Sequence, residues 1–133
     1  MREVFRPTQR TWYQKFRCAF RGVRLGVYGQ SSFVVHFAAA GLAILAAAWL
    51  RIEKTEWCLL MLCITIVLTA EMFNSALEHL ARAVDRSENR YIGSALDIGS
   101  AAVLIASVGA SVAGLIIFIT RAAAWLGTTD LQM

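Results

Sequence analysis

Residues 57–78, W-C-L-L-M-L-C-I-T-I-V-L-T-A-E-M-F-N-S-A-L-E, decide the fold of this chain. The part up to Ala70 carries no charge, and as a helix the whole stretch is long enough to cross a hydrocarbon core of about 30 Å. Glu71, Asn74 and Glu78 then follow at spacings of three and four, which places them within about 60° of one another on one helical stripe. Ionisable groups in a span usually mark a functional site. The alternative is that the stripe only hydrogen-bonds neighbouring helices.

The composition is that of a membrane protein with one domain. Hydrophobic residues make up 58% of the 133 residues, which is more than soluble domains usually contain. Cys18, Cys58 and Cys63 form no C-x-x-C pair, and the two histidines are isolated in the sequence. Zinc, redox and transition-metal sites are therefore not indicated.

The chain is expected to divide into three parts. These are a cytoplasmic surface-helix segment at 1–32, a transmembrane domain at 33–125 and a short C-terminal tail at 126–133. Within the domain the apolar spans are Phe33–Leu50, Trp57–Glu78 and Ala101–Ile119. The predicted fold is an all-α membrane protein with an amphipathic N-terminal surface helix and three transmembrane helices.

The segment before the first span has an apolar stripe at helical spacing. Its members are Tyr13, Phe16, Phe20, Val23 and Val27. Arginines occupy the other faces, which is typical of a helix lying on an anionic membrane surface. Nucleic-acid binding is the rival interpretation of a basic helix. The stripe is too apolar to be left in water and the next segment enters lipid, so no nucleic-acid partner is expected.

The distribution of basic residues predicts the orientation of the spans. Ten of the thirteen Lys and Arg residues lie before the first span or in the loop between the second and third spans. The positive-inside rule places both regions in the cytoplasm and the C-terminus outside. Counting about 1.5 Å per residue from Trp57 puts Glu71 about 21 Å and Glu78 about 32 Å along the second span. The polar stripe of Glu71, Asn74 and Glu78 therefore opens toward the cytoplasm, where ATP and Mg²⁺ are.

The stripe suits phosphoryl transfer, which needs mainly positioning and charge neutralisation. Magnesium takes one or two carboxylates together with substrate phosphates, and Glu78 lies at the interface where such a site could form. Glu71 lies deeper and is less hydrated, which suits a general base acting on a hydroxyl. Asn74 lies between them and can orient a ligand. No Walker A or G-x-G-x-x-G loop is present.

Three motifs resemble those of the small bacterial integral-membrane lipid kinases, diacylglycerol kinase and undecaprenol kinase. The family's central motif, close to E-x-x-N-[ST]-A-[IL]-E, stands here as E-M-F-N-S-A-L-E at 71–78. The second, K-D-x-[GA]-[SA]-[AG]-A-V-L-[IL], stands as L-D-I-G-S-A-A-V-L-I at 96–105, at the family's spacing from the first. A looser third motif reads from Gly22 through Gln30 and Phe33 to His36. The resemblance covers about residues 12–120, and its first two motifs are specific.

This resemblance implies a set of roles for the matching residues. Glu71 would take the proton from the lipid hydroxyl, Glu78 would bind the Mg²⁺ that bridges the ATP phosphates, and Asn74 would support the site. Asp97 would lie at the nucleotide. We also expect Phe33, Glu71 and Ser100 to contact the lipid. The resemblance further implies a homotrimer with shared active sites in the bacterial cytoplasmic membrane.

Two positions depart from the family pattern. Gln30 stands where the family usually has a second metal-binding Glu, and it offers a carbonyl oxygen without charge. Leu96 stands where the family has a nucleotide-contacting Lys. Arg86 or Arg90 in the predicted cytoplasmic loop could replace that lysine as a nucleotide-binding residue.

The sequence therefore predicts a lipid kinase that transfers the γ-phosphate of MgATP to a membrane lipid alcohol. Diacylglycerol and undecaprenol both remain open, and His36 leans slightly toward the undecaprenol type. The alternative function is a non-catalytic membrane module or a small ion pathway of the same fold. Asp97 also has an alternative role, because Ser94-x-x-Asp97 before an apolar run matches a helix capping box.

Overall fold

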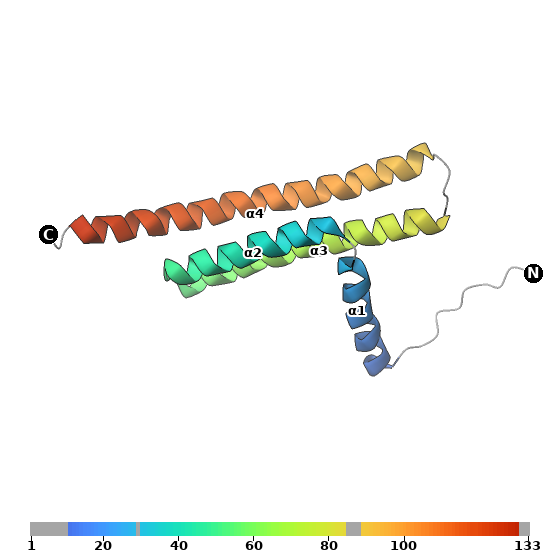
Figure 1. Ribbon diagram of the computed structural model, residues 1–133, viewed down its shortest axis with the longest axis horizontal. Helices are drawn as coiled ribbons and strands as arrows, with labels where there is room; N and C mark the ends of the chain where they lie inside the picture. Colours follow the sequence, from blue (N-terminus) through green and yellow to red (C-terminus); the bar gives the residue numbers. More distant parts are fainter. Residues whose placement is uncertain (1–10, 29, 85–88, 131–133) are drawn as a thin grey trace, which may run out of the picture.

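The computed structural model of the protein describes residues 11–28, 30–84 and 89–130 as helices joined by short connections (Figure 1). The helices in these ranges are α1 (Trp12–Val27), α2 (Ser31–Trp49), α3 (Lys54–Val84) and α4 (Arg90–Asp130). The last three are each long and apolar enough to cross a membrane. The predicted fold class, a surface helix followed by three transmembrane helices, is confirmed.

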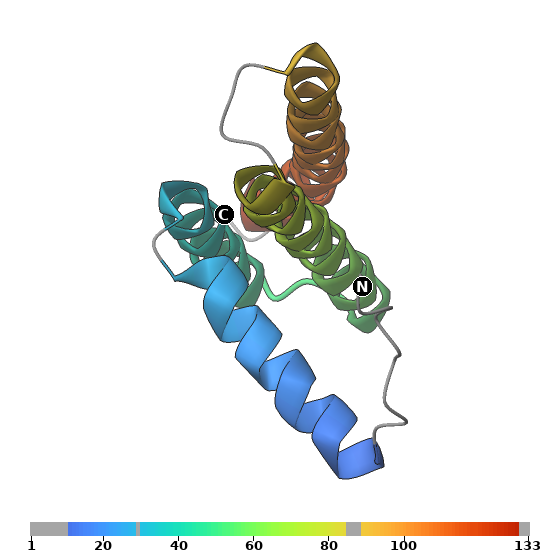
Figure 2. The ribbon, with the colours of Figure 1, turned by 90° about the vertical axis from the view of Figure 1, so that its right-hand side faces the viewer.

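Helix α3 lies between α2 and α4 (Figure 2). Its main packing partner is α4, which runs antiparallel to it, and α2 packs on another side. Helix α1 points steeply away from the bundle axis, and it meets α3 near the start of α2 (Figure 1). This direction suits a helix that lies on the membrane surface while the other three cross the membrane.

The helix ends follow local capping rules. A capping box between Thr11 and Gln14 opens α1. The backbone N–H of Glu53 donates to the side chain of Glu56 where α3 begins. The Asn89 side chain accepts hydrogen bonds from the backbone N–H groups of Tyr91 and Ile92 and so caps the start of α4.

This start of α4 corrects one sequence interpretation. The helix begins at Arg90, well before the predicted span at Ala101, so Ser94 and Asp97 lie inside it. The Ser94 hydroxyl donates to the Arg90 carbonyl, one turn back in the same helix. The interpretation of Ser94 and Asp97 as a capping box is therefore wrong.

The burial pattern is the reverse of that in a soluble protein. Glu71, Asn74 and Ser75 of α3 are buried, whereas most of the large apolar side chains on α2, α3 and α4 are exposed. Apolar side chains face outward and polar ones face protein when lipid is the surrounding solvent. The pattern therefore agrees with three membrane-spanning helices.

A small core joins the three spans at the end of the bundle near the α2–α3 connection. It contains the buried residues Ala47, Ile52, Leu60 and Ile117. Arg121 of α4 forms ion pairs with Glu53 and Glu56 there, with closest distances of 2.7 Å to each carboxylate. We call this end, defined by Glu53, Glu56 and Arg121, the clamp end, and the opposite end, with Glu71 to Glu78, the site end.

Candidate active site

The three polar residues of the predicted stripe share one face of α3. Glu71 is 3% exposed and Asn74 is 9% exposed, while Glu78 is partly exposed. The amide nitrogen of Asn74 donates to Glu78 Oε1 over 3.3 Å. The spacing of three and four residues therefore predicted a real cluster, with one carboxylate deep in the protein and the other nearer its surface.

The first turns of α2 hold the Glu71 carboxylate. The Ser32 hydroxyl donates a hydrogen bond to Glu71 Oε1, and His36 Nε2 lies 3.9 Å from Glu71 Oε2. Ser32 and His36 are four residues apart, so they share a face of α2. Both oxygens of Glu71 thus face groups on α2, and the carboxylate is fixed in place.

Sequence reasoning missed these two partners of Glu71. The residue pattern gave neither Ser32 nor His36 a contact with Glu71. Their four-residue spacing at the start of a span was the one available signal. Which face of α2 meets α3 depends on tertiary packing, and the residue pattern did not determine it.

Glu78 lies among three side chains that donate hydrogen bonds to it. Gln30 Nε2 donates to Glu78 Oε2 over 2.9 Å, and Arg82, one turn further along α3, donates to the same oxygen over 3.0 Å. Asn74 donates to the other oxygen, as described above. The structure therefore brings together Gln30 and Glu78, the two residues predicted to lie at a metal.

Close backbone approach builds the wall of the site opposite α2. A Cβ atom added at Gly99 of α4 would lie 2.7 Å from Asn74 Oδ1 and 2.9 Å from the Leu77 side chain. Asn74 Oδ1 is buried and has no hydrogen-bond partner in the described part of the chain. On another side, a Cβ atom added at Gly26 of α1 would lie 2.8 Å from the Met72 side chain. These two glycines let α1 and α4 reach α3 at the site.

The other predicted site residues are less closely joined to the stripe. Asp97 and Arg90 are exposed on α4, and neither forms a hydrogen bond or ion pair with the stripe within the described ranges. Ser100 is exposed, and its hydroxyl donates to the Leu96 carbonyl. Phe33 is 2% exposed and packs inside the protein. Arg86 lies outside the described residues.

Comparison with known proteins decides the family. A family model described as prokaryotic diacylglycerol kinase matches residues 17–118, which contain all of α2 and α3 and most of α1 and α4. The chain belongs to the prokaryotic diacylglycerol kinase family. Membership in this family makes it an integral-membrane lipid kinase that uses ATP as the phosphoryl donor.

Similar proteins include diacylglycerol kinases and an undecaprenol kinase. The diacylglycerol kinase of Escherichia coli strain K12 is 31% identical over 90 residues, which cover 68% of this chain and 74% of that protein. The diacylglycerol kinase of Shigella flexneri matches with the same identity and coverage. The undecaprenol kinase of Bacillus subtilis strain 168 is 24% identical over 110 residues, which cover 83% of this chain and 89% of that protein.

The donor set of this family member fits a magnesium ion that is completed by a substrate. Within the described residues no three His, Cys, Asp or Glu side chains gather closely enough to hold a metal alone. Glu78 supplies one carboxylate, and the side-chain amides of Gln30 and Asn74 lie beside it. Magnesium commonly takes one or two carboxylates, waters and substrate phosphates. A site of this type needs no further protein ligand.

Proposed function

We propose that this kinase transfers the γ-phosphate of MgATP to the hydroxyl of a membrane lipid alcohol, either diacylglycerol or undecaprenol. One observation carries the proposal. Glu71 is a buried carboxylate held by Ser32 and His36, and it lies one helical turn from the Asn74–Glu78 pair. A proton acceptor, Glu71, and a carboxylate that can bind a metal ion, Glu78, thus lie on one helix face. This arrangement suits phosphoryl transfer to an alcohol.

Glu71 is the general base of this reaction. Its carboxylate accepts the proton of the lipid hydroxyl as the lipid oxygen bonds to the γ-phosphorus of ATP. The bond between that phosphorus and the oxygen bridging the β- and γ-phosphates breaks, and ADP leaves. Ser32 and His36 act as positioning residues that keep the carboxylate aimed at the lipid oxygen.

Glu78, Gln30 and Asn74 would hold the magnesium. Such an ion would supply positive charge against the ATP phosphates. Glu78 supplies the charged oxygen, and Gln30 and Asn74 supply neutral carbonyl oxygens after their amides rotate. Because Gln30 adds no charge, the magnesium is held more weakly than two carboxylates would hold it.

The nucleotide lies toward the start of α4. Asp97 is exposed on α4 two residues before Gly99, and its assignment to the nucleotide rests on its place in the second family motif. Arg90 is exposed about two turns before Asp97, at the first residue of α4. Together with Arg86 it supplies the positive charge that Leu96 does not. Alanine substitution of Arg86 and Arg90 is expected to raise the ATP KM of at least one variant. An unchanged ATP KM in both would refute this role.

The lipid reaches Glu71 from the bilayer beside α2 and α4. Phe33 is buried, and its ring is tilted against that of Phe37 with centroids 5.8 Å apart. Ser100 is exposed on α4 and contacts the lipid head. The N-terminus and the α3–α4 connection lie in the cytoplasm, and the C-terminus lies outside. The protein works as a homotrimer, in which the exposed apolar faces of the spans meet other copies or lipid.

A panel of lipid alcohols tests the function. Membranes containing the protein receive ATP labelled at the γ-phosphate, Mg²⁺ and either diacylglycerol or undecaprenol, and labelled lipid is extracted and measured. We expect label in one of the two alcohols and a loss of about 10²–10⁴-fold in Glu71→Gln. Equal transfer by Glu71→Gln would refute the base, and no labelled lipid with either alcohol would favour a non-catalytic membrane module.

A further inference from the structure

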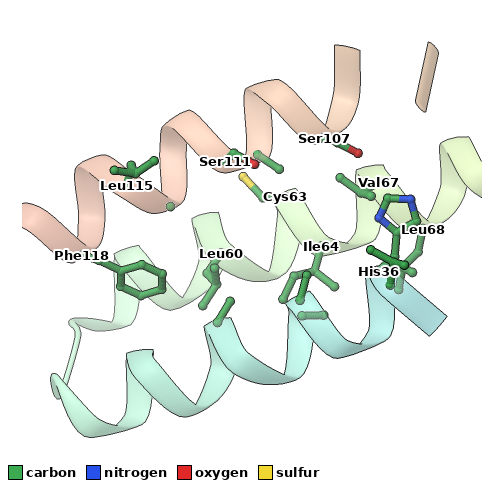
Figure 3. Close-up of a pocket in the computed structure, with 16 residues that line it drawn as sticks. His36, Leu60, Cys63, Ile64, Val67, Leu68, Ser107, Ser111, Leu115 and Phe118 are labelled. Atoms are coloured by element: carbon green, nitrogen blue, oxygen red, sulfur yellow. The ribbon is translucent and has the colours of Figure 1, made fainter. Parts of the chain in front are cut away.

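A cavity of about 510 Å³ lies between α2, α3 and α4 (Figure 3). Its lining is overwhelmingly apolar, and it is partly open rather than sealed. Small residues create much of the space, since alanines or glycines stand where larger side chains would fill it. They are Ala39, Ala40 and Ala43 on α2, and Ala110 and Gly114 on α4.

The cavity is continuous with the candidate active site through one residue. His36 lines the cavity, and its Nε2 atom lies 3.9 Å from Glu71 Oε2. Figure 3 shows His36 beside Val67 and Leu68 at one end, and Leu60 and Phe118 at the other. The cavity therefore begins beside the proposed base and runs along the helices toward the clamp end.

The size and lining of the cavity suit a hydrocarbon chain. Small-molecule sites have volumes of about 300–1,000 Å³, and an apolar cavity of about 150 Å³ already binds benzene. A buried water needs two to four polar partners, and the lining offers few. The Ser107 hydroxyl, one of the few polar groups there, is itself buried without a hydrogen-bond partner in the described part of the chain.

We propose that this cavity binds the hydrocarbon chain of the lipid alcohol and thereby holds its hydroxyl at Glu71. This inference rests on the proposed function, because it assumes that a lipid alcohol is the substrate. Because the bilayer is as apolar as the cavity, the chain is held there by van der Waals packing against the lining and not by the hydrophobic effect. The small side chains on α2 and α4 then determine how bulky a chain the enzyme accepts.

Alkylation of Cys63 reports on occupancy of the cavity. Cys63 lines the cavity, whereas Cys18 and Cys58 are exposed elsewhere, so Cys18→Ser with Cys58→Ser leaves one reporting thiol. The full-length protein in phosphatidylcholine vesicles is treated with N-ethylmaleimide, with and without dioctanoylglycerol or farnesol and in the absence of ATP. At about ten times the apparent Kd of the alcohol, the alkylation rate should fall roughly tenfold.

A matched pair of variants on α2 locates the effect. Ala40 lines the cavity, whereas Ala38 is exposed and does not line it. Ala40→Phe should slow alkylation without any added alcohol, remove further protection, and raise the KM for the lipid while leaving the ATP KM unchanged. Ala38→Phe should behave like the parent. Ala110→Leu fills the same space from α4 and replaces Ala40→Phe if that variant does not fold.

Three outcomes would overturn the inference. They are equal alkylation with and without either alcohol, equal protection by additional phosphatidylcholine, and protection that persists in Ala40→Phe and Ala110→Leu. Because the alkylation assay contains no ATP, its result is independent of phosphate transfer. Normal transfer without protection of Cys63 refutes the chain-binding cavity alone, whereas absence of any transfer refutes the proposed function.

Discussion

Carboxylates lie near both ends of α3, but the groups that surround them differ. At the clamp end, Arg121 contacts both Glu53 and Glu56 at 2.7 Å. Glu56 also lies in the first turn of α3, where a negative charge is favoured by the helix dipole. At the site end, Glu71 is more deeply buried, yet its partners are a hydroxyl and a histidine 3.9 Å away.

This difference separates structural from chemical use of the same side chain. A carboxylate that is paired with arginine at the membrane surface has its charge balanced and can join helices. A buried carboxylate without a close arginine or lysine is costly, and it is retained where its charge is needed. Asn74 adds a second uncompensated group, since its Oδ1 atom has no partner in the described ranges. Burial of these groups therefore lowers the stability of the site end, and we infer that they are kept for the reaction.

Replacement of Glu78 should have the largest effect on magnesium dependence. Glu78→Gln removes the charged oxygen from the proposed ion, so the Mg²⁺ concentration for half-maximal transfer should rise by at least about tenfold. Gln30→Glu is the converse variant, and it should lower that concentration. Magnesium titration of lipid phosphorylation measures both. An unchanged Mg²⁺ requirement in Glu78→Gln would place the ion elsewhere.

Disturbing the close approach of α4 at the site end should have the largest effect on kcat among the changes outside the proposed base and metal ligands. In Gly99→Ala the new Cβ atom would lie 2.7 Å from Asn74 Oδ1, so Asn74 or α4 must move. A displacement of about 1 Å can cost about 10²-fold in rate, and a fall in kcat of that order is expected. Gly109→Ala is the control, because its Cβ atom would meet nothing within 4 Å. Equal kcat values for the two variants would contradict the proposed geometry.

Loss of the Ser32 hydrogen bond should have a smaller effect. A hydrogen bond to a charged group contributes about 1.5–3 kcal/mol, so Ser32→Ala should lower kcat by about tenfold at the lower end of this range and by about 10²-fold at its upper end. Ser31→Ala is the control, because Ser31 is exposed on the neighbouring face of α2. A kcat of Ser32→Ala equal to that of Ser31→Ala would show that Ser32 does not position Glu71.

Loss of the ion pairs at the clamp end should lower stability and should have the smallest effect on transfer. Arg121→Gln removes the ion pairs with Glu53 and Glu56, so the thermal unfolding temperature in detergent should fall by several degrees. Added salt should lower the unfolding temperature of the parent more than that of the variant, because salt screens exposed ion pairs. Transfer at low temperature should be unchanged. A large loss of transfer with an unaltered unfolding temperature would reverse the roles of the two ends.

The sequence predicted those features that depend on one helix. The apolar run before Glu71 gave the span, and the three- and four-residue spacings gave the shared face of Glu71, Asn74 and Glu78. The resemblance to the family assigned Gln30 and Glu78, which are far apart in the chain, to one metal site, and in the structure the two side chains share a hydrogen bond. The cavity was not predicted, because a volume between three helices depends on how all three pack.

The features that the sequence did not predict depend on contacts between helices. Arg121 pairs with Glu53 and Glu56, from which it is separated in the sequence by most of α3 and α4. No local pattern in the sequence selects Arg121 as the partner of these carboxylates. The close approach at Gly99 likewise requires the position of α4 relative to Asn74. The early start of α4 had a local signal in Asn89, which caps the helix. The predicted span began at Ala101 because the residues between Asn89 and Ala101 are more polar than the run that follows.

The most direct test of the account compares one carboxylate from each end of α3. Glu71→Gln and Glu56→Gln each remove one negative charge and keep the shape of the side chain. Lipid phosphorylation and the thermal unfolding temperature are measured for both variants under the same conditions. We expect Glu71→Gln to lose transfer by about 10²–10⁴-fold and to stay folded, and Glu56→Gln to unfold at a lower temperature and keep transfer. Transfer retained in Glu71→Gln would contradict the role of Glu71 as the base.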